Sequence, residues 1–164
     1  MRLELHYKIG KNVCSELKEM DCHIHEKLFL LGNLFPDLIL SFFWCRHEYQ
    51  PSREYIRKKL IMLKKKPRLF SFHLGVLTHY ICDYFCYPHS TGYDKGLIQH
   101  LLYEIRQKVP QKFYRTKLNI AAFTIEELEK LIKWYDKFRI SFDDDESDYH
   151  VAAMMACNFL QAAY

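Results

Sequence analysis

The segment 69–87, "LFSFHLGVLTHYICDYFCY", is strongly apolar, yet it carries a histidine and an aspartate four residues apart, His79 and Asp83. Its length and its stop before Pro88 predict a buried helix. Positions i and i+4 of a helix face the same way, so both polar side chains project from one face. Burying an imidazole or a carboxylate without a partner is costly. The fold therefore has to surround this pair with compensating groups.

The spacing of apolar residues is helical along the rest of the chain too, and it predicts an all-α protein. Glycine and proline weaken or end helices, and they fall inside the patterns of the first 44 residues. We therefore expect a first helix over 3–20, whose apolar pattern is interrupted only at Gly10, a second over 24–34 ending near Gly32 and Asn33, and a separate short element from Pro36 to Trp44.

Further helices are predicted where apolar periodicity runs up to a proline, over 52–66, 69–87 and 95–109. No internal repeat is present, and no stretch rich in Gly, Ser or Pro divides the chain. We therefore expect a single compact multi-helix domain over residues 1–164.

The C-terminal third carries two signals for the start of a helix. Thr124 followed by Glu127 has the pattern of a capping box, which predicts a helix from there to about Arg139. The acidic run "DDDESD", 143–148, precedes the last apolar pattern. Negative charge at that place favours the N-terminal end of a helix dipole, and the run lacks the spacing of a calcium-binding loop.

Composition excludes several classes of protein. The 24 Lys and Arg residues exceed the 20 Asp and Glu residues by only four, so no stable nucleic-acid complex is expected. The six cysteines show no disulfide framework, as is typical of reduced thiols. The first ten residues lack the pattern of a signal peptide, and no run of about 18 apolar residues occurs. These features favour a cytoplasmic location.

The spacing of several histidines and carboxylates is typical of metal ligands. The i, i+4 pairing of His79 with Asp83 recurs at His100 and Glu104, and His89 follows the proline that ends the apolar helix. Imidazole and carboxylate are ligands that zinc accepts. The candidate set is too large for one tetrahedral ion and predicts two or three ions with a shared carboxylate. It comprises His6, Asp37, His47, His79, Asp83, His89, His100 and Glu104.

These residues carry a resemblance. The pattern H-x3-D-x5-H followed by H-x3-E is similar to the signature of the zinc-dependent phospholipase C family, which shares its fold with the S1/P1 nucleases. The strings "GNLFPD", "RHEY" and "HYKIGKNV" also resemble small bacterial members of that family, and the likeness covers about residues 5–105. It implies an all-α fold, a zinc cluster and hydrolysis of a phospholipid.

The resemblance also implies roles. One zinc ion would be held by Asp37, His47, His79 and Asp83, a second by His89, His100 and Glu104, and a third by His6 and the bridging Asp83. In the family a free N-terminus completes the third site, so Met1 is a further candidate through its amine. A metal-bound hydroxide would attack phosphorus, and Asp37 would orient or deprotonate it. Leu38 stands where an aromatic residue would be expected for choline binding, so the head-group preference does not transfer.

Two other functions stay open. A single-strand nuclease-like phosphodiesterase would keep the metals and use aromatic residues to stack bases, for which Tyr80, Tyr84, Tyr87 and Tyr93 are available. A metal-stabilised module without turnover would bind lipid or protein instead. An HD-type phosphohydrolase is excluded, because no His-Asp dipeptide occurs.

Some features have plainer explanations. The basic segment 57–68 is suited to peripheral contact with an anionic membrane, but a solvated helix face explains it as well. Four histidines fall outside the ligand pattern and are interpreted as ordinary side chains: His23, His25, His73 and His150.

Overall fold

Helices make up all the regular structure in the described part of the chain, which confirms the all-α expectation. The computed structural model describes residues 1–39, 48–90, 93, 96–107, 118–139 and 145–162. The elements are α1 (Leu3–Glu19), α2 (Glu26–Leu38), α3 (Tyr49–Leu63), α4 (Phe70–Tyr84), the short 3₁₀ helix η2 (Tyr87–His89), α5 (Gly96–Arg106), α6 (Ile125–Arg139) and α7 (Asp145–Gln161).

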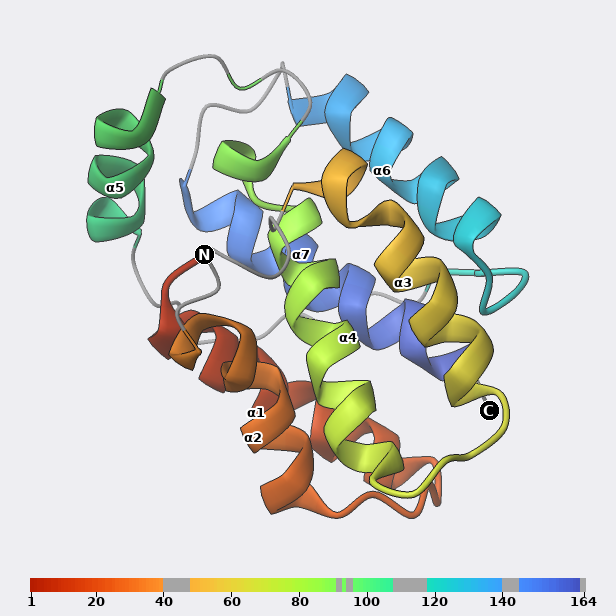
Figure 1. Cartoon of the computed structure of the whole chain (residues 1–164). Coiled ribbons are helices and arrows are strands. Elements are labelled where there is room, and N and C mark those ends of the chain that lie inside the picture. The colour runs from red at the N-terminus through yellow and green to blue at the C-terminus, as the bar shows by residue number, and fades with distance from the viewer. Residues whose placement is uncertain (40–47, 91–92, 94–95, 108–117, 140–144, 163–164) are drawn as a thin grey trace.

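The apolar segment forms α4, the central helix of the fold. Figure 1 shows α1 and α2 on one flank of it, α3 and α6 on the other, and α7 behind. Every residue of α4 from Leu74 to Tyr84 is buried, including His79 and Asp83. Each fully buried Leu or Ile contributes about 1.5–3 kcal/mol to folding. The helix that carries the polar pair is thus also the one that the other helices enclose.

The closest helix contact is between α2 and α4, and two glycines make it possible. A Cβ on Gly75 would lie 2.0 Å from the backbone oxygen of Phe29, and a Cβ on Gly32 would lie 2.0 Å from the backbone oxygen of Phe72. Both distances are far below contact distance, so only glycine allows the two backbones to approach this closely. His79 lies one helical turn after Gly75, so this contact brings α2 against the face of α4 that carries the polar pair.

The helix end expected near Gly32 and Asn33 is wrong, because α2 runs without interruption through Gly32 and Pro36. The first helix continues through Gly10, where only its apolar pattern is interrupted. Gly10 and Gly32 serve close packing instead of ending a helix. Pro36 lies two residues before the end of α2 at Leu38, so its missing N–H affects only the last turn. The rest of the expected short element, 40–44, lies outside the described residues.

Other boundaries differ by a few residues from those expected. The central helix ends at Tyr84, and Pro88 lies inside η2 instead of stopping a longer helix. The last helix begins at Asp145, within the acidic run and not after it. The capping residue Thr124 accepts a hydrogen bond from the backbone N–H of Glu127 at 3.3 Å, as predicted for α6. No helix in the described part of the chain combines the length and hydrophobicity needed to cross a bilayer.

Candidate metal centre

Asp83 lies at the centre of the polar cluster, and each of its oxygens lies near imidazole nitrogens. Its Oδ2 is 3.2 Å from Nε2 of His79, its neighbour one turn earlier on α4. Its Oδ1 is 3.2 Å from Nε2 of His6 and 3.8 Å from Nε2 of His89. The N-terminal nitrogen of Met1 is 2.9 Å from the same oxygen. A fully buried carboxylate is therefore surrounded by nitrogen atoms from three different parts of the chain.

Three candidate ligands gather on one side of Asp83. We call His6, Asp37 and His79 the first ligand group, because their ligand atoms all lie within 4.8 Å of one another. Oδ1 of Asp37 is 3.6 Å from Nε2 of His79, and its Oδ2 is 4.0 Å from Nε2 of His6. Both histidines are buried, whereas Asp37 is exposed at the edge of the group. His47, expected to contribute here, lies outside the described residues.

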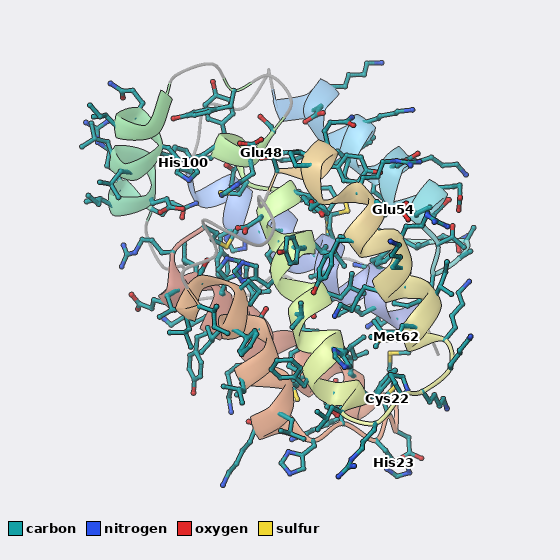
Figure 2. All side chains as sticks on the ribbon, in the orientation of Figure 1. Cys22, His23, Glu48, Glu54, Met62 and His100 are labelled. Atoms are coloured by element: carbon teal, nitrogen blue, oxygen red, sulfur yellow. The ribbon has the colours of Figure 1, made fainter. Side chains whose placement is uncertain are left out.

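A second set of three includes His89, whose Nε2 also lies near Oδ1 of Asp83. We call His89, His100 and Glu104 the second ligand group, and their ligand atoms also lie within 4.8 Å of one another. Nε2 of His100 is 3.2 Å from Oε1 of Glu104, so the i, i+4 pair of α5 is in direct contact. Figure 2 shows His100 on the side of α5 that faces the other helices. These are the residues that the resemblance assigned to the second zinc.

The amine of Met1 lies between Asp83 and the second ligand group. Besides its contact with Asp83, it lies 3.0 Å from Oε1 of Glu104 and 3.2 Å from Nε2 of His89. Burial lowers the pKa of this amine, but Asp83 and Glu104 outweigh burial and hold the pKa well above its usual value. An ammonium therefore fills a position where candidate metal ligands converge. The cluster is built to receive positive charge.

The protonation states suit a metal. Burial lowers the pKa of His6 to about 4, so at neutral pH its imidazole is uncharged. Burial raises the pKa of Asp83, but the Met1 ammonium and the nearby imidazoles hold it well below the usual value. Burial also raises the pKa of Glu104, yet the His100 hydrogen bond and the Met1 amine bring it to about 2. Neutral imidazole and ionised carboxylate are the forms that bind metals, so these residues fit zinc.

Asn33 positions two of the candidate ligands, and the sequence analysis assigned it no role. Its backbone oxygen lies 2.9 Å from Nδ1 of His79. A proton on Nδ1 satisfies this contact and leaves Nε2 of His79 directed at Asp37 and Asp83. The side-chain amide of Asn33 also donates to the backbone oxygen of His6. Its place inside "GNLFPD", four residues before Asp37, was the only signal in the sequence.

Asp148 fixes the elements that carry the second ligand group. This fully buried carboxylate accepts hydrogen bonds from the backbone N–H of Tyr87, at 2.8 Å, and from the hydroxyl of Tyr135, at 2.6 Å. It also accepts one from the hydroxyl of Tyr103, the residue before Glu104. One side chain of α7 thus connects η2, α5 and α6. The sequence analysis explained the acidic run by the helix dipole alone and missed this role.

The family model for zinc-dependent phospholipase C matches residues 5–156. The chain belongs to the zinc-dependent phospholipase C family. Neither the search of curated proteins nor that of solved structures found a match. Membership, together with the two ligand groups, supports zinc as the metal. The match includes every candidate ligand from His6 to Glu104, and it extends beyond the resemblance at 5–105 to include Asp148 in α7.

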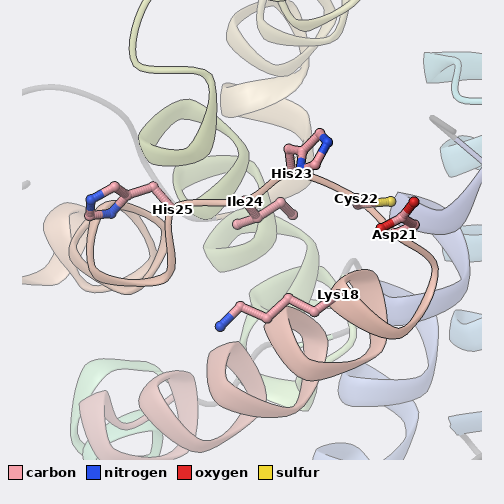
Figure 3. Close-up of a pocket in the computed structure, with 6 residues that line it drawn as sticks. All are labelled: Lys18, Asp21, Cys22, His23, Ile24 and His25. Carbon is pink, nitrogen blue, oxygen red and sulfur yellow. The ribbon is translucent and has the colours of Figure 1, made fainter.

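The remaining histidines lie away from both ligand groups. His23 and His25 line an open pocket of about 460 Å³ in the turn between α1 and α2, where Figure 3 shows their rings pointing in different directions. Nδ1 of His25 accepts the backbone N–H of Leu28 and so caps α2. His73 lies 3.3 Å from Nζ of Lys59. His25 thus has a structural role, and the interpretation of the four as ordinary side chains stays a prediction.

The position of Met1 gives a first prediction for a chain whose first residue is Met1. Adding Gly-Ser before Met1 converts the amine into an amide, which carries neither a charge nor a free lone pair. Breaking a buried ion pair on one side costs about 3–5 kcal/mol. We expect the metal-free protein to lose stability by about that amount, and the zinc content to fall. Chemical denaturation and elemental analysis measure the two effects. The same extension placed after Tyr164 is the control, and equal losses in the two proteins would contradict the prediction.

Proposed function

We propose that this protein is a zinc-dependent phosphodiester hydrolase that acts on a phospholipid in the manner of phospholipase C. The observation that carries the proposal is the convergence of two ligand groups on one buried carboxylate, Asp83. A shared carboxylate between adjacent ions is the arrangement expected when metals stabilise both the attacking and the leaving oxygen. Family membership supports the phospholipid as substrate.

The assignment of ligands follows the two groups. We place one ion with the first ligand group and a second with the second ligand group, with Asp83 between them. His47 would complete the first site. The amine of Met1 lies between Asp83 and Glu104 and would complete a third site together with His6. This layout requires two or three zinc ions for each chain.

The residues of the chain have separate tasks in the reaction. When bound, zinc supplies a nucleophile at neutral pH and positive charge against the phosphoryl oxygens. Asp37 is the exposed carboxylate of the first ligand group, so it can accept a proton from the attacking water. The water oxygen then bonds to phosphorus, the ester bond to the alcohol breaks, and the proton passes to the leaving alkoxide. Asn33 would hold the His79 ring so that its Nε2 stays directed at Asp37 and Asp83.

The nuclease alternative has less support. Tyr80 and Tyr84 are buried in the core, so two of the four tyrosines considered for base stacking are unavailable. Tyr87 packs edge-on against Tyr93 at a ring distance of 5.3 Å. A metal-stabilised binding module would have the same metal site but would not hydrolyse phospholipid. An assay of hydrolysis therefore distinguishes it from the proposed enzyme.

Elemental analysis and an assay of hydrolysis test the proposal together. Protein purified without chelators should hold two or three zinc ions for each chain and release a phosphorylated head group from a phospholipid. Chelation should abolish this activity, and added zinc should restore it. Asp37→Asn should lower the rate at least about hundredfold, which is the scale of general-base catalysis. Zinc without hydrolysis would favour the binding module, and hydrolysis of single-stranded DNA alone would favour the nuclease.

A further inference from the structure

Helix α5 exposes a stripe of large aliphatic side chains. The exposed fractions are 75 % for Ile98, 57 % for Leu101, 37 % for Leu102 and 62 % for Ile105. Their spacing of three, four and seven residues places all four on one face of the helix. We call this set the α5 stripe. Single exposed aliphatic residues are common, but a continuous stripe indicates a surface that binds something apolar.

The opposite face of α5 is polar and points into the protein. His100 and Glu104 join the second ligand group, and the hydroxyl of Tyr103 donates to the buried Asp148. At the end of the helix Gln107 is buried and donates to the sulfur of Cys86 at 3.4 Å. Helices of soluble proteins normally bury their apolar face and expose their polar one. Helix α5 has this pattern reversed.

The charges around the α5 stripe match an anionic, apolar surface. Glu104 is the only acidic residue of α5, and the Met1 amine and His100 pair with it on the inner face. Arg106 is exposed at the end of the helix. Arg2 reaches across from the N-terminus to the backbone oxygen of Gln107 at 3.0 Å, but Glu4 pairs with it at 3.0 Å, so the positive charge beside the stripe comes from Arg106. Apolar faces bordered by arginine are typical of helices that lie in the surface of a bilayer.

We propose that the α5 stripe inserts into the surface of a phospholipid bilayer and thereby holds the zinc site at the level of the lipid phosphates. An interfacial helix sinks its apolar face about 5–10 Å below the head groups, and a helix with side chains is about 10–12 Å thick. With the stripe buried at that depth, His100 and Glu104 on the opposite face lie at about the height of the phosphate layer. The inference rests on the proposed function, because that function makes a bilayer phospholipid the substrate.

A second exposed apolar group lies beside the other ligand group. Leu38 and Ile39, which follow Asp37 directly, have exposed fractions of 57 % and 46 %. In Figure 1 the end of α2 and the whole of α5 lie on the same flank of the molecule, near the N-terminus. Both ligand groups thus have an apolar neighbour on this flank, which is consistent with one surface of contact.

The basic segment 57–68, expected to offer a membrane contact, lies elsewhere. It forms the C-terminal part of α3 and the turn before α4, and Figure 1 shows α3 and α5 on opposite sides of the molecule. Contact through this segment would leave the zinc site facing away from the bilayer. We therefore assign the contact to α5.

Flotation with phosphatidylcholine vesicles, prepared with and without phosphatidylserine, tests the assignment. All proteins in this experiment are full-length and zinc-loaded, and the phosphatidylcholine is a phosphonate analogue, with carbon in place of the scissile ester oxygen, so that the lipid is not consumed. The test variant adds Leu101→Gln and Ile105→Gln. The matched control adds Met20→Gln and Ile61→Gln, which remove side chains exposed by 44 % and 49 % on other surfaces. We expect the test variant to bind vesicles at least about tenfold more weakly and the control to bind like its parent.

Several results would overturn the assignment. Equal flotation of the test variant and its parent would do so, and so would an absence of flotation in the parent. Loss of binding in Lys64→Gln/Lys65→Gln/Lys66→Gln, with the α5 variant unaffected, would move the contact to the basic segment. A parent that is dimeric without lipid, and that becomes monomeric on changing Leu101 and Ile105, would make the stripe a contact between two copies.

An assay of hydrolysis separates failure of this inference from failure of the proposed function. On ordinary phospholipid, the changes at Leu101 and Ile105 should lower the ratio between hydrolysis of vesicle lipid and hydrolysis of a monomeric short-chain phospholipid. An unchanged ratio with full activity would overturn the inference and keep the function. Flotation that depends on α5, with no hydrolysis of either lipid, would overturn the function and keep the membrane contact.

Discussion

Replacing Asp83 by asparagine is expected to remove most of the bound zinc. Both carboxylate oxygens of Asp83 lie within 4 Å of imidazole nitrogens from the two ligand groups, and the side chain is fully buried. Asparagine keeps the shape but loses the negative charge and one of the two acceptor oxygens. Even groups that only support a ligand contribute tenfold to a hundredfold to metal affinity. A shared ligand should contribute more than about a hundredfold.

The metal-free protein should also respond to Asp83→Asn. The ammonium of Met1 lies 2.9 Å from Oδ1 of Asp83, and without this carboxylate only Glu104, at 3.0 Å, still compensates its charge. Leaving one partner of a buried ion pair wholly uncompensated costs about 3–5 kcal/mol, so with Glu104 in place we expect a loss below that range. Chemical denaturation in the presence of a chelator measures this cost apart from the loss of zinc.

The control for Asp83→Asn is His150→Ala. His150 is half-buried on α7, outside both ligand groups, so its removal should leave the zinc content unchanged. Zinc for each chain is measured by elemental analysis after gel filtration. Equal zinc content in the two variants would be incompatible with Asp83 as a shared ligand.

Sequence reasoning reached the candidate ligands because most of the signal is local. The pairs His79–Asp83 and His100–Glu104 follow from helix geometry alone, since four residues bring a side chain round to the same face. The structure places each pair as expected, at 3.2 Å in both cases. That these residues bind metal stays a prediction.

The residues that support the ligands were missed because their roles depend on contacts between distant parts of the chain. Asn33 reaches His79 only because α2 and α4 approach closely, and nothing near Asn33 in the sequence indicates that distance. Asp148 belongs to an acidic run that the helix dipole explains without any tertiary contact. Its partners Tyr103 and Tyr135 come from two other helices. Tertiary packing, which the sequence does not state, decides both roles.

At two glycines, tertiary packing also overrides what the local sequence favours. Gly10 and Gly32 interrupt helical patterns, and local propensity therefore favours a break at each. The structure shows that a Cβ at Gly10 would lie 2.6 Å from the amide nitrogen of Asn33. These positions give up helix propensity in return for close packing around the ligands. A glycine inside a helix costs about 1 kcal/mol relative to alanine, and burial of a helix face easily outweighs this cost.

Replacing Gly75 by alanine is expected to destabilise the protein by at least about 3 kcal/mol, at the upper end of the range for overpacked cores. The new Cβ would lie 2.0 Å from the backbone oxygen of Phe29 and 2.8 Å from the backbone nitrogen of Asn33. Backbone atoms inside a helix cannot move aside one at a time, so α2 and α4 must separate. Total stability is only about 5–15 kcal/mol, which makes this a large loss.

The same separation should damage the metal site, because Asn33 moves with α2 and His79 with α4. The 2.9 Å contact between Nδ1 of His79 and the Asn33 oxygen would lengthen, and the imidazole would lose its fixed orientation. We therefore expect zinc binding to weaken even in the fraction that stays folded. Urea denaturation in the presence of a chelator and zinc titration measure the two effects.

Gly10→Ala and Gly96→Ala are the controls for the loss of stability in Gly75→Ala. At Gly10 the new Cβ would meet the side chains of Asn33 and Leu30, which can shift, so the cost should be smaller than at Gly75. At Gly96 no atom lies within 4 Å, and the cost is limited to the positive φ of 68°, about 1–2 kcal/mol. We therefore expect Gly75→Ala to cost more stability than Gly10→Ala or Gly96→Ala, because among these three positions only at Gly75 does the new methyl group meet backbone atoms. If Gly75→Ala were as stable as Gly96→Ala, the close approach of α2 and α4 would not hold the ligand-bearing helices together.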